Sequence, residues 1–264
     1  MWLSEEDIVY KRALNFEKPF INAPGSLGFC PDPHSMPFLS HFGAFLTNPI
    51  SWRPRHPARD RAFLPFPGGY LLHTGLPNPG INRAIRQFSR CWANAPLPII
   101  VHLLAEAPET LAEMVRKLEN LENVMAVELG IPPNCDPAQL EAFTSAATGE
   151  LPVILALSPE QVPTLHQTIQ DLQPSAIHLC QPRGTLPDVQ GVPLTGRLYG
   201  PAIFPTMLHM LEKEYSLDIP LIINGGVFHK WQADALIKAG ARAVALGTVL
   251  WGAQVETLFP ENVS

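Results

Sequence analysis

Two glycine sites are the features of this sequence that most directly predict chemistry. Gly225-Gly226 follow a continuous apolar run at residues 220–224, and Gly247-Thr248 follow another at residues 243–246. Glycine lets backbone N–H groups crowd around an anion, and a helix N-terminus favours negative charge. The two sites, one βαβ unit apart, therefore predict a phosphate-binding site. The alternative is that the glycines serve only as turns.

These glycines need strands to hold them, and the chain shows a regular alternation of strand-like and helical stretches. The clearest helix has apolar residues at helical spacing from Leu111 to Leu121, with charged residues on its other face. Strand-like apolar runs occur at residues 19–22, 43–47, 98–103, 124–129, 153–157, 176–180, 220–224 and 243–246. Eight strands alternating with helices predict an α/β fold, a (β/α)8 TIM barrel in a single domain over residues 1–264. In such barrels the loops after the seventh and eighth strands often hold a phosphate.

The composition argues against several classes of function. The 264 residues carry a net charge of −6 and no basic run, which disfavours nucleic acid or an anionic membrane surface as a partner. No apolar stretch approaches the ~20 residues of a membrane span, and residues 1–16 lack the pattern of a secretory signal. The four cysteines form no CxxC pair, which favours reduced thiols in a cytoplasmic protein. The expected partner is a small-molecule substrate.

A proline-rich segment at residues 49–79 is long for a loop in a compact domain, and loops of this length are usually functional. Because it follows the second predicted strand, we expect it to arch over the catalytic face. It carries Arg53, Arg55, Arg59 and Arg61. These arginines either steer an anionic substrate or form an ordinary solvated surface.

Taken in order, these segments resemble the dihydroorotate dehydrogenase family of FMN-dependent (β/α)8 barrels, from about Pro19 to Trp251. INAPGSLGF at residues 21–29 is similar to the family's turn after strand one, and GAFLTNPISWRPR at 43–55 is similar to its Gly-x-x-x-Thr-Lys segment. PGGYLLHTGLPNPG at 67–80 is similar to Pro-Gly-Gly-x-Leu-Asn-x-x-Gly-Leu-x-Asn-Pro-Gly, and GRLYGPA at 196–202 is similar to Gly-Gly-Leu-Ser-Gly-Pro-Ala. The resemblance implies FMN as the cofactor, with its phosphate at the two glycine sites.

The resemblance also implies which residues would hold this cofactor. They are Ala23, Gly25, Asn48, Gly200, Gly225, Gly226, Gly247 and Thr248. Barrels of this family commonly pair, so a homodimer is a further expectation.

The chain departs from the family where the flavin ring and orotate are held. The resemblance places Asn48 and Ala156 where the family has two flavin lysines, and Leu72 and Gly130 where it has asparagines. The position of the family's catalytic base is a proline. A buried polar group left without its partner costs about 1–3 kcal/mol. We therefore expect that this protein does not oxidise dihydroorotate.

Two residues are candidates for acid–base chemistry. Cys135 lies one residue past the position of the family's base, and a thiol pKa shifts readily with its surroundings. His73 lies beside Leu72, and imidazole changes its charge near neutral pH. The alternatives are an inert half-buried thiol and a histidine that packs or caps its loop. Asn134 and Gln181 are candidates for substrate binding, and no cluster of residues has metal-ligand spacing.

Three functions remain open at this stage. The first is an FMN-dependent oxidoreductase that acts on CH–CH groups of a small substrate less polar than dihydroorotate. The second is a catalytically silent homologue that binds a phosphate-bearing ligand. The third is a lyase or isomerase that binds a sugar phosphate without flavin. None of them assigns a role to His178, which we expect to pack as an ordinary barrel residue.

Overall fold

The structure of the protein is a computed structural model that describes residues 14–213, 218–252 and 254–259. Most of the N-terminal segment on which the secretory-signal expectation rests lies outside these residues. In the part of the chain that is described, no helix combines the length and the apolarity that crossing a membrane requires.

Eight parallel strands close into a barrel, which confirms the predicted fold. Their order is β1-β12-β11-β8-β7-β6-β5-β2, and a parallel bridge between Ile21 and Ala44 joins the two ends of this order. Asn22 completes the joint, because its side-chain amide exchanges hydrogen bonds with the backbone of Leu46. The strands are β1 (Phe20–Asn22), β2 (Phe45–Leu46), β5 (Ile99–Leu104), β6 (Val124–Gly130), β7 (Val153–Leu157), β8 (Ala176–Leu179), β11 (Leu221–Ile223) and β12 (Ala243–Leu246).

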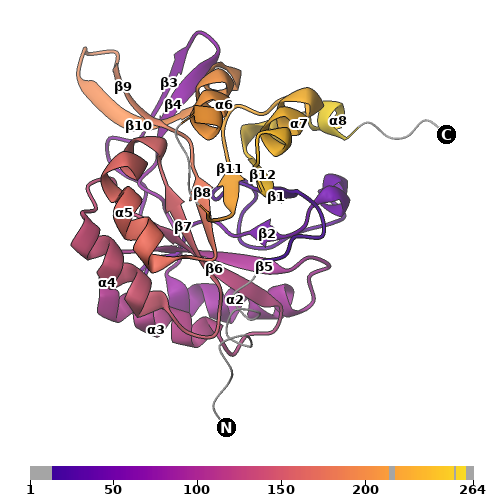
Figure 1. The fold of residues 1–264 in the computed structure, drawn as a ribbon, viewed down its shortest axis with the longest axis vertical. Coiled ribbons are helices and arrows are strands. Elements are labelled where there is room, and N and C mark those ends of the chain that lie inside the picture. The colour runs from indigo at the N-terminus through magenta and orange to yellow at the C-terminus, as the bar shows by residue number, and fades with distance from the viewer. Residues whose placement is uncertain (1–13, 214–217, 253, 260–264) are drawn as a thin grey trace, which may run out of the picture.

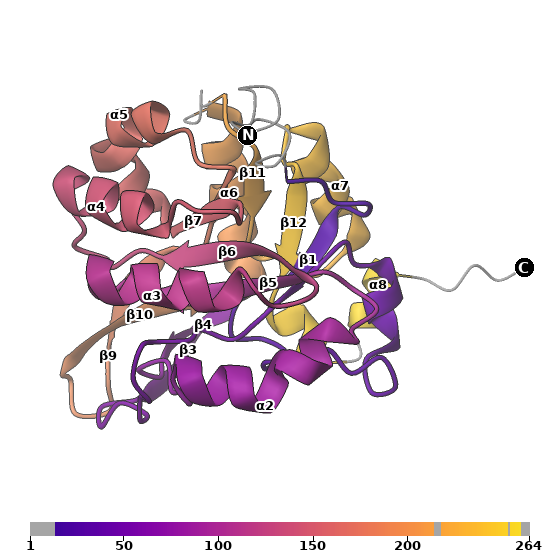
Figure 2. The same ribbon diagram turned by 90° about the horizontal axis from the view of Figure 1, so that it is seen from below.

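Helices surround the barrel, as Figures 1 and 2 show from two sides. The α-helices are α2 (Ile81–Ala93), α3 (Pro108–Leu118), α4 (Pro137–Ala147), α5 (Val162–Leu172), α6 (Phe204–Lys213), α7 (Lys230–Lys238) and α8 (Val255–Leu258). Short 3-10 helices are η1 (Pro37–His41), η2 (Pro159–Gln161), η3 (Pro201–Ile203) and η4 (Thr248–Trp251). The apolar stripe predicted from Leu111 lies on α3, where Leu111, Met114, Val115 and Leu118 are buried against the sheet.

Inside the barrel, an apolar layer gives way to a polar layer toward the carboxyl ends of the strands. The apolar layer includes Ile100, Ala126 and Ala176. Side chains on one face of a strand recur every second residue. Two positions further along the same strands lie His102, Glu128 and His178, all of them buried. The interior is therefore a packed core whose upper end carries ionisable groups.

A second, antiparallel sheet extends from the barrel, and we call it the arm. It has the order β3-β4-β10-β9, and Figure 1 shows its two hairpins side by side next to α6. The strands are β3 (Ala62–Phe66), β4 (Gly69–His73), β9 (Arg183–Pro187) and β10 (Pro193–Tyr199). The predicted loop at residues 49–79 thus contains a hairpin, and the loop assignment is wrong for those residues. Their alternation of exposed and half-buried positions is that of a sheet with one solvated face.

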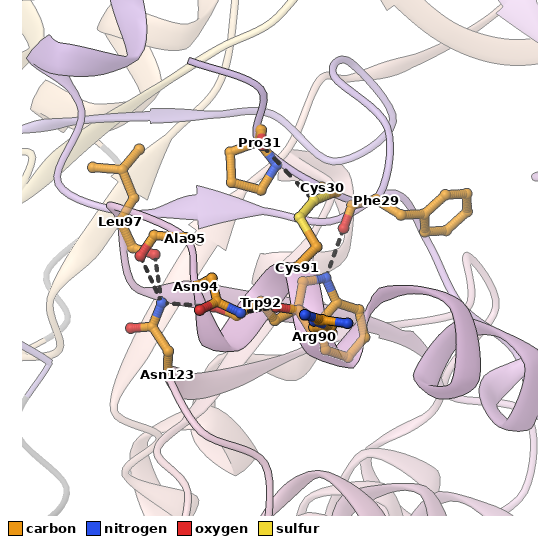
Figure 3. Close-up of a disulfide and its surroundings, with 10 residues drawn as sticks. All are labelled: Phe29, Cys30, Pro31, Arg90, Cys91, Trp92, Asn94, Ala95, Leu97 and Asn123. Carbon is orange, nitrogen blue, oxygen red and sulfur yellow. Dashed lines mark hydrogen bonds between the residues drawn. A yellow bond between two sulfur atoms is a disulfide. The ribbon is translucent and has the colours of Figure 1, made fainter. Parts of the chain in front are cut away.

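One pair of cysteines contradicts the prediction that all four thiols are reduced. Cys30, in the loop after β1, forms a disulfide with Cys91 on α2, and their Cα atoms lie 6.3 Å apart. Figure 3 shows the bond beside Trp92, whose indole nitrogen donates a hydrogen bond of 2.7 Å to the carbonyl of Phe29. Pairing across 61 residues depends on tertiary proximity, which cysteine spacing does not reveal. Cys135 and Cys180 are free and buried.

Candidate functional site

A cavity of about 390 Å³ opens at the carboxyl ends of the barrel strands, and we call it the mouth cavity. Its floor comes from the ends of β5, β6 and β8, including His102, Gly130 and Cys180. Its roof comes from the arm and the loop after β4. Residues from the arm and that loop which line the cavity are Leu72, His73, Thr74, Gly75, Leu76, Arg183, Gly196, Arg197 and Tyr199. This volume lies in the range typical of small-molecule sites.

His102 belongs to a buried cluster of three ionisable residues, His102, Glu128 and His178, which we call the buried triad and which reaches the floor through His102. The Nδ1 atom of His102 lies 2.6 Å from one oxygen of Glu128, and the Nδ1 atom of His178 lies 2.6 Å from the other. His102 and Glu128 occupy paired positions on the neighbouring strands β5 and β6. Glu128 is fully buried, so its charge interacts with both imidazoles at low dielectric.

Glu128 is ionised in this setting. Burial alone would raise its pKa, but the nearby His178 and the hydrogen bonds from both imidazoles outweigh that effect and lower it to about 2. An ionised carboxylate accepts hydrogen bonds and donates none, so both Nδ1 atoms carry protons. The two rings then differ only at Nε2. His178 Nε2 is buried without a hydrogen-bond partner, whereas His102 reaches the cavity wall.

Gly130 makes room for the His102 ring. A Cβ atom built at residue 130 would come within 2.5 Å of His102 Nε2, which is closer than real Cβ contacts allow. The resemblance placed an asparagine of the family at this position. The imidazole at residue 102 therefore packs in this position only because residue 130 has no side chain.

Two arginines face the same cavity from the arm. Arg183 and Arg197 are paired directly across β9 and β10, and both line the cavity. Burial and the charge of Arg197 lower the pKa of Arg183. Arg197 donates a hydrogen bond of 3.1 Å to the carbonyl of Gln181. Like charges opposite each other in a sheet are destabilising, so this end of the cavity favours an anion.

Two groups of the cavity, Cys180 and Tyr199, are uncharged. Burial raises the pKa of Cys180 to about 12, although Arg197 opposes the shift, and Glu128 adds to it. Burial also raises the pKa of Tyr199 to about 12, against the effect of Arg197 and with smaller contributions from Tyr70 and Cys180. One uncharged thiol therefore lies within electrostatic reach of both Arg197 and Glu128.

A second, much smaller hollow lies next to the mouth cavity, and we call it the glycine pocket. Its volume is about 10 Å³, which suits about one water molecule. Four of the expected cofactor residues line it: Gly200, Gly226, Gly247 and Thr248. Asn224 also lines it, and the Nδ2 atom of this residue is buried without a hydrogen-bond partner. Tyr199 and Gln181 line both hollows and so form the wall between them.

Tyr199 is held in this wall by the arm. Its ring stacks on Tyr70 from β4 with centroids 5.3 Å apart and an interplanar angle of 10°. Tyr70 in turn stacks obliquely with Phe63 from β3 at 4.6 Å. The aromatic stack fixes the wall because each ring is anchored on a different strand of the arm.

The other four expected cofactor residues are Gly225, Ala23, Gly25 and Asn48. Gly225 packs against Met207 of α6, and a side chain at residue 225 would collide with that methionine. Ala23 is buried, while the space around Gly25 is open. The Asn48 side chain accepts a hydrogen bond of 3.0 Å from the backbone of Gly28. Among the described residues that line the two hollows, none of these four is found.

The structure brings together only some of the predicted catalytic and substrate residues. His73 and Gln181 line the mouth cavity, and His73 Nε2 lies 3.4 Å from a carboxylate oxygen of Asp60. Asn134 is exposed, and neither it nor Cys135 is among the cavity's described lining residues. Burial and the charge of Asp136 raise the pKa of Cys135 to about 11. Among the described residues, no group of three or more potential ligands is arranged to hold a metal ion.

Sequence reasoning missed His102 and Glu128 as functional residues. Each is the single ionisable residue of an otherwise apolar strand, and this pattern is typical of a core residue whose polar atoms have hydrogen-bond partners. The available signal was that three strands of one barrel carry an ionisable residue two positions after an apolar one, so the three must meet inside.

Comparison with known proteins gives one consistent result. The chain is 31% identical over 257 residues to dihydroorotate dehydrogenase B (NAD(+)), catalytic subunit, of Pelobacter propionicus, covering 89% of this chain and 84% of the relative. It is 27% identical over 256 residues to the corresponding protein of Desulforudis audaxviator, covering 89% and 83%. The crystal structure of DHODH from Eimeria tenella in complex with ferulenol shares the fold, with a TM-score of 0.68 at 15% identity over 90% of this chain and 78% of that one.

No family model matches the chain. The identity and coverage of the Pelobacter relative are nevertheless sufficient, and they agree with the barrel described above. This chain belongs to the dihydroorotate dehydrogenase family.

Proposed function

We propose that this family member binds a small molecule in its mouth cavity and does so without FMN. The observation that carries the proposal is the wall formed by Tyr199 and Gln181. It separates the cavity, which has room for a ring system, from the glycine pocket, where the resemblance puts the phosphate. With about 10 Å³, that pocket has the space of about one water, which argues against a phosphate group there. These observations support a ligand other than FMN.

The ring end of the site supports the same proposal. Asn48 and Ala156 stand where the resemblance has flavin lysines, and the Asn48 amide is engaged with the backbone of Gly28. Leu72 lines the cavity where the resemblance has a substrate asparagine. An apolar side chain offers no partner to a polar cyclic amide, so dihydroorotate is not the proposed ligand. The proposal keeps the catalytically silent homologue, but places its ligand in the mouth cavity.

A second candidate is an FMN-dependent oxidoreductase that acts on CH–CH groups, which homology to this family suggests. The observation in its favour is the mouth cavity itself, whose volume suits a cofactor ring with a small substrate. This function requires the Tyr199 ring to leave the wall, against its stacking on Tyr70.

The absorbance spectrum of the purified full-length protein, followed by titration with FMN, tests the two candidates. We expect a colourless protein and no quenching of FMN fluorescence on titration. A protein that is yellow as isolated, or that takes up FMN in a one-to-one ratio, would overturn the proposal and establish cofactor binding in its place.

A variant that removes the Tyr199 ring from the wall between the two hollows tests the same point. Tyr199→Ser restores the serine of the family motif, and we expect it to increase FMN affinity by at least about tenfold, because it joins the two hollows. Val189→Ser changes a fully exposed residue at the tip of the arm and serves as the control. Equal FMN affinity in the wild type, Tyr199→Ser and Val189→Ser would show that Tyr199 is not what excludes the cofactor.

A further inference from the structure

His102 of the buried triad and the two arginines of the arm line the mouth cavity, and the proposed function assigns them no task. We propose that Arg197 and Arg183, which line the cavity together with His102, bind the carboxylate of a small ligand with an apolar body. This inference rests on the proposed function only in that the mouth cavity is the ligand site.

The first step is the orientation of the two imidazoles inside the barrel. Each turns its Nδ1 atom toward Glu128, so Nε2 is the ring atom left for another partner. On His178 this atom is buried without a hydrogen-bond partner. On His102, which lines the cavity, it lies beside Gly130.

The second step is the position of the arginines. Arg183 and Arg197 face the cavity from paired positions on the arm. The carboxylate of Glu160 accepts a hydrogen bond of 2.7 Å from the backbone nitrogen of Arg183 and offsets part of the charge of that arginine. Arg55, which also lines the cavity, is paired with Glu106 at 2.8 Å. A guanidinium group matches the two oxygens of a carboxylate with parallel hydrogen bonds, so Arg197 is the main cationic group offered to a ligand.

The third step is the character of the rest of the wall. Leu72, Leu76, Leu104 and Ile131 line the cavity, together with prolines from the loops after β1, β2 and β6. Burial of apolar ligand surface against such a wall is favourable at about 25 cal/mol per Å². One anionic end and one apolar body describe an aryl or branched-chain carboxylate.

Benzoate is the simplest probe of this class, and benzamide is its uncharged counterpart of the same shape. Titration calorimetry of the full-length protein should show benzoate binding, with benzamide at least about tenfold weaker, since a hydrogen bond to a charged group contributes about 1.5–3 kcal/mol. Equal affinity for the two compounds, or no benzoate binding, would overturn the proposal.

Variants assign the contacts. Arg197→Gln should weaken benzoate binding about tenfold or more and leave benzamide binding nearly unchanged. Arg59→Gln, which changes an exposed arginine of the segment at residues 49–79 that does not line the cavity, is the control. If Arg197→Gln binds benzoate as tightly as Arg59→Gln, the arginine site is excluded.

His102 is tested in the wild-type protein, since a change inside the barrel can prevent folding. In imidazole nitrogen NMR of protein labelled at histidine, the Nε2 signal of a ring whose Nδ1 is hydrogen-bonded to a carboxylate should move with benzoate and not with benzamide. Nε2 signals that do not respond to benzoate would overturn the proposal. Uptake of FMN would instead overturn the proposed function, and the calorimetric result with benzoate would still decide this one.

Discussion

The mouth cavity and the glycine pocket lie side by side, but they have changed in opposite ways. The glycine pocket keeps the glycines of the family motif, yet Tyr199 closes it off to the space of about one water. The mouth cavity lacks the motif's polar residues, yet it has the space of a ligand site and a new set of charged groups. The retained glycines also have a packing role. Gly225 packs against α6 and Gly226 lies close to the backbone of Phe204, so their packing favours glycine whether or not a phosphate binds there.

The largest expected difference between the two hollows is in stability. Glu128→Ala removes the acceptor of two buried imidazoles and should lower the free energy of unfolding by about 3–5 kcal/mol. Asn224→Ala, at the wall of the glycine pocket, should cost less than about 1 kcal/mol, because the amide nitrogen of Asn224 already lacks a partner. Urea unfolding measures both. Equal losses of unfolding free energy in the two variants would contradict this difference between the two hollows.

The next effect is a dependence of stability on acid. The pKa of Glu128 is about 2 in the folded protein and 4.5 when unperturbed, so its contribution is complete above about pH 4.5 and is lost as the pH falls toward 2. The 2.5-unit difference corresponds to about 3 kcal/mol. Unfolding of wild type and Glu128→Gln should therefore differ more at about pH 6 than at about pH 3. A difference that does not change with pH would mean that the carboxylate is not ionised in the fold.

The smallest effect concerns the space beside His102. Gly130→Ala forces the imidazole to move and should lower the free energy of unfolding by about 1–3 kcal/mol. Gly252→Ala is the matched control, because nothing lies within 4 Å of a Cβ at that residue. Thermal unfolding of the pair measures the difference. A Gly130→Ala protein as stable as the control would show that the ring is free to turn aside.

The barrel could be predicted because the signal for each strand lies within a few consecutive residues. Each of the eight strands is a short, mainly apolar run, and such a run by itself indicates a parallel strand that is covered on both faces. The arm escaped prediction because its strands are half-exposed and rich in proline and glycine, as in β3 and β4. The sequence of these residues predicts a loop. They form a sheet because β10 pairs with β4, which lies more than 100 residues earlier in the chain.

The candidate site was harder to predict because its residues are far apart in the sequence. Glu128 is 26 residues from His102 and 50 from His178, and only barrel closure brings their strands together. His73 and Gln181 could be placed because they stand within recognisable motifs, and both do line the cavity. Cys135 was singled out by its spacing from a motif position. Its burial and its neighbour Asp136 disfavour the thiolate, and it is not among the described residues that line the cavity, although Pro133 is.

The contact between residue 130 and the His102 ring has a consequence for how the two positions can vary. Any residue larger than glycine at 130 needs a smaller or differently turned group at 102, whereas a smaller group at 102 is compatible with Gly130. An asparagine engineered into the end of β6 should therefore be tolerated best when residue 102 is made smaller first. In homologous sequences, glycine at the first position should accompany histidine at the second.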